Sequence, residues 1–131
     1  FPTFITENNN GDVVVSDILG VFPKCGQLIV TSREGIHRFT YTGPSPSGRG
    51  LLFPQGICTD VLSNILVYDG ITHTVQMIDR DGRFLSYLLA CNSLGGSLSY
   101  DMSTHQLLVG SWNSKIVNVY RYIDRHTSFT G

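Results

Sequence analysis

The sequence predicts an all-β protein made of short antiparallel strands, and three observations support that class. Apolar residues alternate with polar ones over short runs, as at Ile65 and Val67, which is the two-residue period of a half-buried strand. Turn formers separate these runs, among them the dipeptide Asp81-Gly82, which favours a tight hairpin because glycine adopts positive φ at no steric cost. The 131 residues include 14 glycines and 5 prolines, a composition that suits a turn-rich β protein better than a helical one.

The same order of strand-like runs occurs three times along the chain. A short run opens each copy, at 2–6, 54–60 and 96–101. An apolar run follows, at 11–17, 64–69 and 106–111, and the next run spans 28–35, 75–82 and 116–124. The first two copies close with a further run, at 36–43 and 83–89. The sequence therefore predicts three homologous units of four antiparallel strands each.

The spacing of the copies predicts a repeat architecture. Asp69 and Ser111, which end equivalent runs, are 42 residues apart, whereas Asp17 and Asp69 are 52 apart. The extra residues fall in two connections, and repeat proteins tolerate insertions in loops while their strands stay unchanged. Four short strands at a period near 42 residues are typical of a β-propeller blade, with a β-sandwich as the competing architecture.

These runs resemble the NHL repeats of the β-propellers at the C-terminal end of TRIM-NHL proteins. The resemblance covers residues 4–124 and rests on NNNGDVVVSD, FPQGICTD with its P-x-G-I start, SNILVYD, VQMIDRDG and IVNVYRYID. The third copy departs from the pattern because Ser111 stands where the others carry aspartate. The resemblance implies three repeats, or half of a six-bladed propeller, with repeat 1 at about 1–52, repeat 2 at about 53–93, repeat 3 at about 94–124 and a tail at 125–131.

Half of a propeller would leave an apolar face uncovered at each end, because a blade buries its faces only against neighbouring blades. Two arrangements would cover these faces. The chain begins with Phe1 instead of methionine, which favours a piece cut from a longer propeller. Alternatively, a homodimer would complete the six-bladed ring.

Composition and motifs narrow the classes of function. The net charge of −1 provides no general attraction to nucleic acid or to an anionic membrane, and no run approaches the roughly 20 apolar residues of a membrane span. Three cysteines, an odd number, and the absence of an N-x-S/T sequon favour a reducing, cytoplasmic setting. The chain contains no nucleophile, metal-ligand or phosphate-loop motif, so we expect no enzymatic activity, no metal and no cofactor.

Alternate connections of an antiparallel unit lie at one end of its sheet, which we call the loop face. The ligand-binding residues that we expect on the loop face are Lys24, Arg49, His73, Trp112, Asn113 and Lys115. An aromatic side chain among basic ones suits stacking on a single-stranded base or gripping a peptide. The simpler alternative is that Trp112 packs over a loop and the lysines are solvated.

Asp17 and Asp69 end equivalent runs near this face. They could hold a metal or act as general bases, but such sites need several converging ligands that the sequence does not supply. The sequence therefore favours a turn-capping role, in which each carboxylate binds the backbone amides that follow it.

The resemblance implies a non-catalytic binding platform, most simply the protein-recognition module of a TRIM-NHL-like protein of the ubiquitin ligase type. Two alternatives stay open: single-stranded RNA binding through the loop face, and a carbohydrate-binding half-propeller that dimerises. The low net charge favours a protein partner over RNA.

Overall fold

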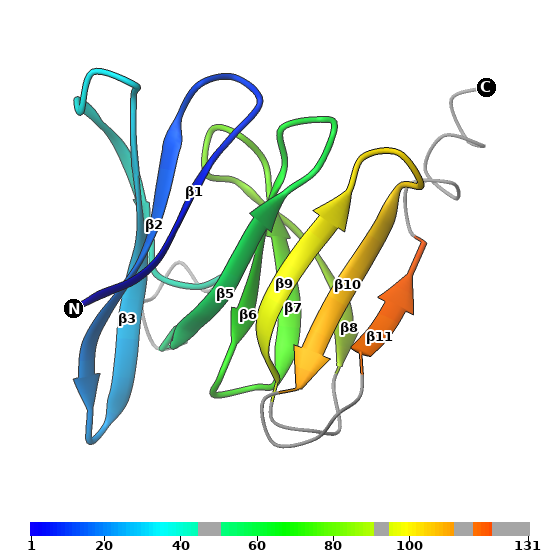
Figure 1. The fold of residues 1–131 in the computed structure, drawn as a ribbon. Helices are drawn as coiled ribbons and strands as arrows, with labels where there is room; N and C mark the ends of the chain where they lie inside the picture. Colours follow the sequence, from blue (N-terminus) through cyan, green and yellow to red (C-terminus); the bar gives the residue numbers. More distant parts are fainter. Residues whose placement is uncertain (45–50, 91–94, 112–116, 122–131) are drawn as a thin grey trace.

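The computed structural model describes residues 1–44, 51–90, 95–111 and 117–121, and every regular element within them is a β-strand (Figure 1). The prediction of an all-β antiparallel protein is therefore confirmed. Sheet 1 comprises β1 (Pro2–Glu7), β2 (Val13–Val21), β3 (Lys24–Thr31) and β4 (His37–Tyr41). Sheet 2 comprises β5 (Pro54–Thr59), β6 (Ile65–Asp69), β7 (Thr74–Ile78) and β8 (Phe84–Ala90). Sheet 3 comprises β9 (Gly95–Asp101), β10 (Gln106–Ser111) and β11 (Val117–Tyr120).

Each sheet is a meander in which neighbouring strands are also consecutive in the sequence. All pairs are antiparallel, and the turns follow the predicted chemistry. At the β7–β8 turn, Asp79 Oδ1 accepts hydrogen bonds from the amides of Asp81 and Arg83, both at 2.9 Å. Gly82 in the same turn has a φ of +94°, a conformation that glycine adopts without a Cβ clash.

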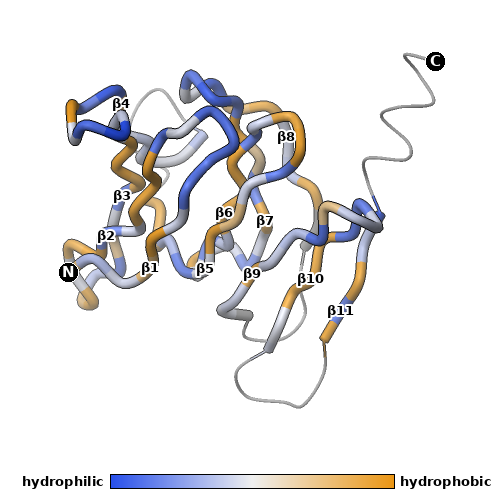
Figure 2. Tube along the Cα trace, turned by 45° about the horizontal axis from the view of Figure 1, so that its top comes forward, coloured by the Kyte–Doolittle hydropathy of each residue, from blue (hydrophilic) through white to orange (hydrophobic). Residues whose placement is uncertain are grey.

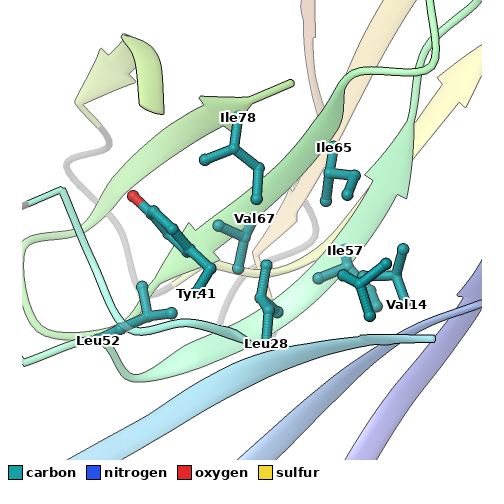
Figure 3. Close-up of a cluster of buried hydrophobic side chains, with 9 residues drawn as sticks. Val14, Leu28, Tyr41, Leu52, Ile57, Ile65, Val67 and Ile78 are labelled. Atoms are coloured by element: carbon teal, nitrogen blue, oxygen red, sulfur yellow. The ribbon is translucent and has the colours of Figure 1, made fainter. Parts of the chain in front are cut away.

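The three sheets stack face to face in chain order (Figure 1). Strand β6 lies in the middle of the stack, and all five of its residues are buried. Ile65 and Val67 belong to the apolar cluster between sheets 1 and 2, which Figure 3 shows together with Val14 and Leu28 of sheet 1. The alternate residue Leu66 belongs instead to the cluster between sheets 2 and 3. Figure 2 shows the same distribution as hydrophobic colour along the strands and hydrophilic colour in several turns.

Gly56 of β5 lies directly against the backbone of β9 in sheet 3. A Cβ atom built at this position would lie 2.3 Å from the carbonyl oxygen of Gly96 and 2.7 Å from the amide nitrogen of Leu98, both in β9. No side chain fits in that space, so glycine is required by the backbone contact itself. This gives a physical reason for the glycine in the P-x-G-I start of the second copy.

Polar groups fasten sheet 1 to sheet 2 around the apolar cluster. The guanidinium of Arg38 in β4 contacts the carboxylate of Asp12, donates to Asp81 Oδ1 at 2.9 Å and donates to the carbonyl oxygen of Arg80 at 3.0 Å. The hydrogen bonds to the two carboxylates raise the pKa of Arg38 above its ordinary value. The residues that accept from Arg38 come from turns of both sheets, so this side chain acts as a clamp between them.

The sequence interpretation was wrong about the connection between the first two long strands. The predicted runs end at residue 17 and resume at residue 28, but β2 continues to Val21 and β3 begins at Lys24, with Ile18 opposite Gly26 and Val21 opposite Lys24. Asp17 lies within β2, opposite Gln27 of β3, and its carboxylate accepts from Gln27 Nε2 at 3.1 Å and from the amine of Phe1 at 3.1 Å. The bond from Gln27 and the adjacent amine hold the pKa of Asp17 below its ordinary value.

Candidate functional site

Two neighbouring sheets form a depression at the loop face. Its volume is about 400 Å³, and the residues that line it are Pro23, Lys24, Leu51, Gly70, Ile71 and His73. Pro23 and Lys24 come from the β2–β3 hairpin of sheet 1, whereas residues 70–73 form the β6–β7 turn of sheet 2. Both turns lie at the same end of the stack in Figure 1, so the predicted common location of these connections is confirmed. We call this depression the Lys24 pocket.

Asp69 joins the segments at residues 51–53 and 70–72, which contribute Leu51, Gly70 and Ile71 to the Lys24 pocket. Only 1% of the residue is exposed, and its Oδ1 accepts from the amides of Phe53 at 2.9 Å and Ile71 at 3.1 Å. Its Oδ2 accepts from Thr72 Oγ1 at 2.7 Å. A backbone bond from the Gly70 amide to the carbonyl oxygen of Phe53, at 2.9 Å, joins the same two segments. The turn-capping role predicted for Asp69 is confirmed, whereas the same prediction was wrong for Asp17, which lies within a strand.

His73 occupies a backbone position that few side chains tolerate. Its φ is +56°, and its Nδ1 lies 3.2 Å from the hydroxyl of Tyr68. His105, at the β9–β10 turn, has a φ of +55° and the same contact with Tyr100 at 2.9 Å. Both turns have the sequence Y-D-x-x-T-H, at 68–73 and 100–105, a repeated signal that our sequence interpretation missed. His73 therefore shapes its turn and also lines the pocket.

Lys24 provides the positive charge of the pocket. Its side chain is exposed, and its Nζ lies 5.6 Å from the centroid of the Phe53 ring. This distance is within the range of a cation–π interaction, which holds the ammonium group beside the pocket. Lys24 and His73, two of the predicted site residues, are thus brought to one depression from different sheets.

Exposed apolar side chains surround this charge. Leu51 is 46% exposed and Ile71 is 38% exposed, and both line the pocket. Phe22, at the tip of the β2–β3 hairpin, is 97% exposed. Sequence reasoning assigned no role to these three residues, because isolated apolar residues in predicted connections give no periodic signal. The other predicted site residues, Arg49, Trp112, Asn113 and Lys115, lie outside the described residues.

A second depression lies at the opposite end of sheet 1. It has a volume of about 390 Å³ and is lined by Asn9, Asn10, Gly11, Asp12, Ser32, Arg33 and Glu34. Arg33 pairs with Glu7 at 3.0 Å, and Asp12 contacts Arg38, so two of the charged residues that line this depression already have partners within the protein. Across the described part of the chain, no three histidine, cysteine, aspartate or glutamate side chains gather as metal ligands would. None of the described segments forms a helix with the length and apolarity that a membrane crossing needs.

Comparison with known proteins gives no family and one structural likeness of low sequence identity that we describe. No family model matches the chain, and no curated protein matches it. Among solved structures, it is similar to a protein of unknown function from Bacteroides caccae, with 12% sequence identity and a TM-score of 0.42. The match covers 92% of this chain, which spans 60% of the length of that protein.

Proposed function

We propose that the three sheets are blades of an NHL-type β-propeller and that the chain is a non-catalytic platform which binds a protein partner at the Lys24 pocket. The blade assignment is supported by the resemblance in sequence and by the meander order of the strands described in each of the three consecutive sheets. The observation that carries the binding proposal is the pocket itself. It joins Lys24 of sheet 1 and His73 of sheet 2 with exposed apolar side chains, at an end of the stack made of turns.

The chemistry of the Lys24 pocket favours a peptide ligand over a nucleic acid. The pocket presents one lysine among apolar groups such as Leu51 and Ile71, with Phe22 nearby. Such a surface suits an apolar anchor residue followed by a carboxylate, since desolvated apolar anchors supply most of the energy at protein interfaces. RNA binding depends instead on several cations that neutralise successive phosphates. By its resemblance to TRIM-NHL proteins, the platform would select targets for a ubiquitin ligase-type parent protein.

Peptide selection tests this proposal. A random peptide library displayed on phage would be selected on the 131-residue chain, and selected peptides would be measured by fluorescence polarisation. We expect acidic and apolar residues to be enriched, and we expect Lys24→Glu to weaken binding at least about tenfold. His73→Asn should also weaken binding, and asparagine is chosen because it tolerates positive φ.

The control is Arg80→Glu, which makes the same change of charge at an exposed position in the β7–β8 turn, at the other end of the stack. Its peptide affinity should match that of the wild type. A second titration would use a single-stranded oligouridine at low and high salt. Binding of oligouridine that falls steeply with salt, without selection of any peptide, would replace the protein proposal with the RNA alternative.

A further inference from the structure

The strand register shows which face of each sheet packs against which adjacent sheet. Val14, Leu66 and Leu108 occupy equivalent positions in β2, β6 and β10, three residues before Asp17, Asp69 and Ser111. We call the face that carries these three residues the leading face of each sheet, and the opposite face the trailing face. Val14 packs in the cluster that contains Val67 of the trailing face of sheet 2. Leu66 packs in the cluster that contains Leu107 of the trailing face of sheet 3.

Both internal contacts therefore follow one rule, in which a leading face covers the trailing face of the next sheet. The rule leaves two faces that the described residues do not cover: the trailing face of sheet 1 and the leading face of sheet 3. Their exposure differs sharply from that of their internal counterparts. Ile5 on the trailing face of sheet 1 is 72% exposed, whereas its counterpart Ile57 in sheet 2 is 7% exposed.

The leading face of sheet 3 shows the same contrast. Val117 lies opposite Gly110 in the register and is 61% exposed. Its counterparts Leu28 in sheet 1 and Val75 in sheet 2 are fully buried by the following sheet. Val119 and Leu108 extend this apolar surface, since they are paired across β10 and β11. Among the described residues, one face of each kind is thus left uncovered.

We propose that a second copy of the chain covers these faces, with the leading face of sheet 3 in one copy docked on the trailing face of sheet 1 in the other. This contact would repeat the packing that already joins sheets 1 and 2 and sheets 2 and 3. It is a heterologous contact, and two copies related by a two-fold axis would form it twice and leave neither face free. The inference rests on the register of the sheets and is independent of what the Lys24 pocket binds.

Sedimentation velocity on the purified chain tests the pairing. The wild type should sediment with twice the chain mass at about 100 μM, where even a micromolar contact is populated. Ile5→Lys should damage the trailing face and Val117→Glu the leading face, and each should raise the dimer dissociation constant at least about tenfold, since a buried apolar side chain is replaced by a charge. Circular dichroism would verify that both variants remain folded.

A mixture of the two variants separates head-to-tail pairing from pairing of like faces. The Ile5→Lys chain keeps its leading face and the Val117→Glu chain keeps its trailing face, so an equimolar mixture should recover dimers through the intact contact. The control is Ile36→Lys, because Ile36 is 68% exposed but lies in the β3–β4 turn, on neither face. A monomeric wild type, a failure of the mixture to recover dimers, or equal dissociation by the control would each overturn the proposal.

Discussion

Replacing Gly56 by alanine is the most direct test of how sheets 2 and 3 pack. The added Cβ would lie 2.3 Å from the carbonyl oxygen of Gly96, whereas close carbon–oxygen contacts between strands are about 3.3–3.6 Å, so β9 must retreat by roughly 1 Å. The atoms in the way belong to the backbone, and they cannot yield by rotation of a side chain. A gap of this size forfeits about a quarter to a half of the dispersion energy of the groups that separate.

We expect Gly56→Ala to lower the free energy of unfolding by about 3 kcal/mol, the upper part of the range for overpacked cores. For a chain of this length that corresponds to a fall in Tm of roughly 10 °C. The measurement is thermal unfolding followed by circular dichroism at one fixed protein concentration. Hydrogen exchange would add a local readout, because protection should fall in β9 and β10 while β2 and β3 keep theirs.

The matched control is Gly110→Ala in β10. A Cβ at Gly110 would meet the Ser97 hydroxyl oxygen at 3.3 Å and the Ser97 Cβ at 4.0 Å, so only a flexible group must adjust. Its stability should stay within about 1 kcal/mol of the wild type, since alanine also restricts the unfolded chain. A Tm for Gly56→Ala within a few degrees of the wild type would refute the reasoning, as would equal losses in the two variants.

Three further predictions concern single side chains. Arg38→Met removes the clamp between sheets 1 and 2 and should cost about 1.5–3 kcal/mol in urea unfolding; an unchanged midpoint would show that its ion pairs contribute nothing. Tyr41→Phe leaves Gln76 Oε1 without the donor now 2.8 Å away, so we expect a loss of about 1–3 kcal/mol by the same measurement, and a stability equal to wild type would contradict it. Burial raises the pKa of the Cys58 thiol from an ordinary 9.0 to about 12. Iodoacetamide at pH 8 should therefore label half-exposed Cys25 and spare Cys58 until urea unfolds the protein. Peptide mass spectrometry would measure the labelling of each cysteine. Because the pKa of Cys58 is higher in the folded protein, the stability that its neutral thiol contributes is complete below pH 9 and is lost as the pH rises towards 12. Labelling of Cys58 in the folded protein at pH 8 would contradict its burial.

The strands were predictable because each carries a local signal. In the stretch ILVYDGITHTVQMIDRDG, a run of apolar residues, a glycine-led turn and a second run correspond to β6, its turn and β7. The prediction failed at residues 18–26 because an aspartate was interpreted as the end of a strand. Asp17 lies opposite Gln27 of the next strand and accepts from its side chain, a pairing that no local pattern could place there.

The candidate site was predictable only in part, for a related reason. Lys24 and His73 could be assigned to one end of the stack from the alternation of strand direction alone. Their meeting in one pocket depends on the stacking of sheets 1 and 2 and on residues 51–53, which are held against the β6–β7 turn by Asp69. That contact joins residues 16 positions apart in different elements, and a single sequence contains no period that would reveal it.

A short chain of hydrogen bonds links the segments that carry the Lys24 pocket to the interface between sheets 1 and 2. Asp69 holds the pocket segments at Phe53 and also accepts from Gln76 Nε2 at 3.4 Å. Gln76, which is 1% exposed, accepts in turn from the hydroxyl of Tyr41, whose ring packs in the cluster between sheets 1 and 2. Each member is buried, so displacing one would leave polar atoms without water to replace the lost bond. The segments that carry the pocket are therefore tied to the core, whereas Lys24 and Ile71 are exposed. The binding platform that we propose would combine such a fixed frame with surface residues that can vary.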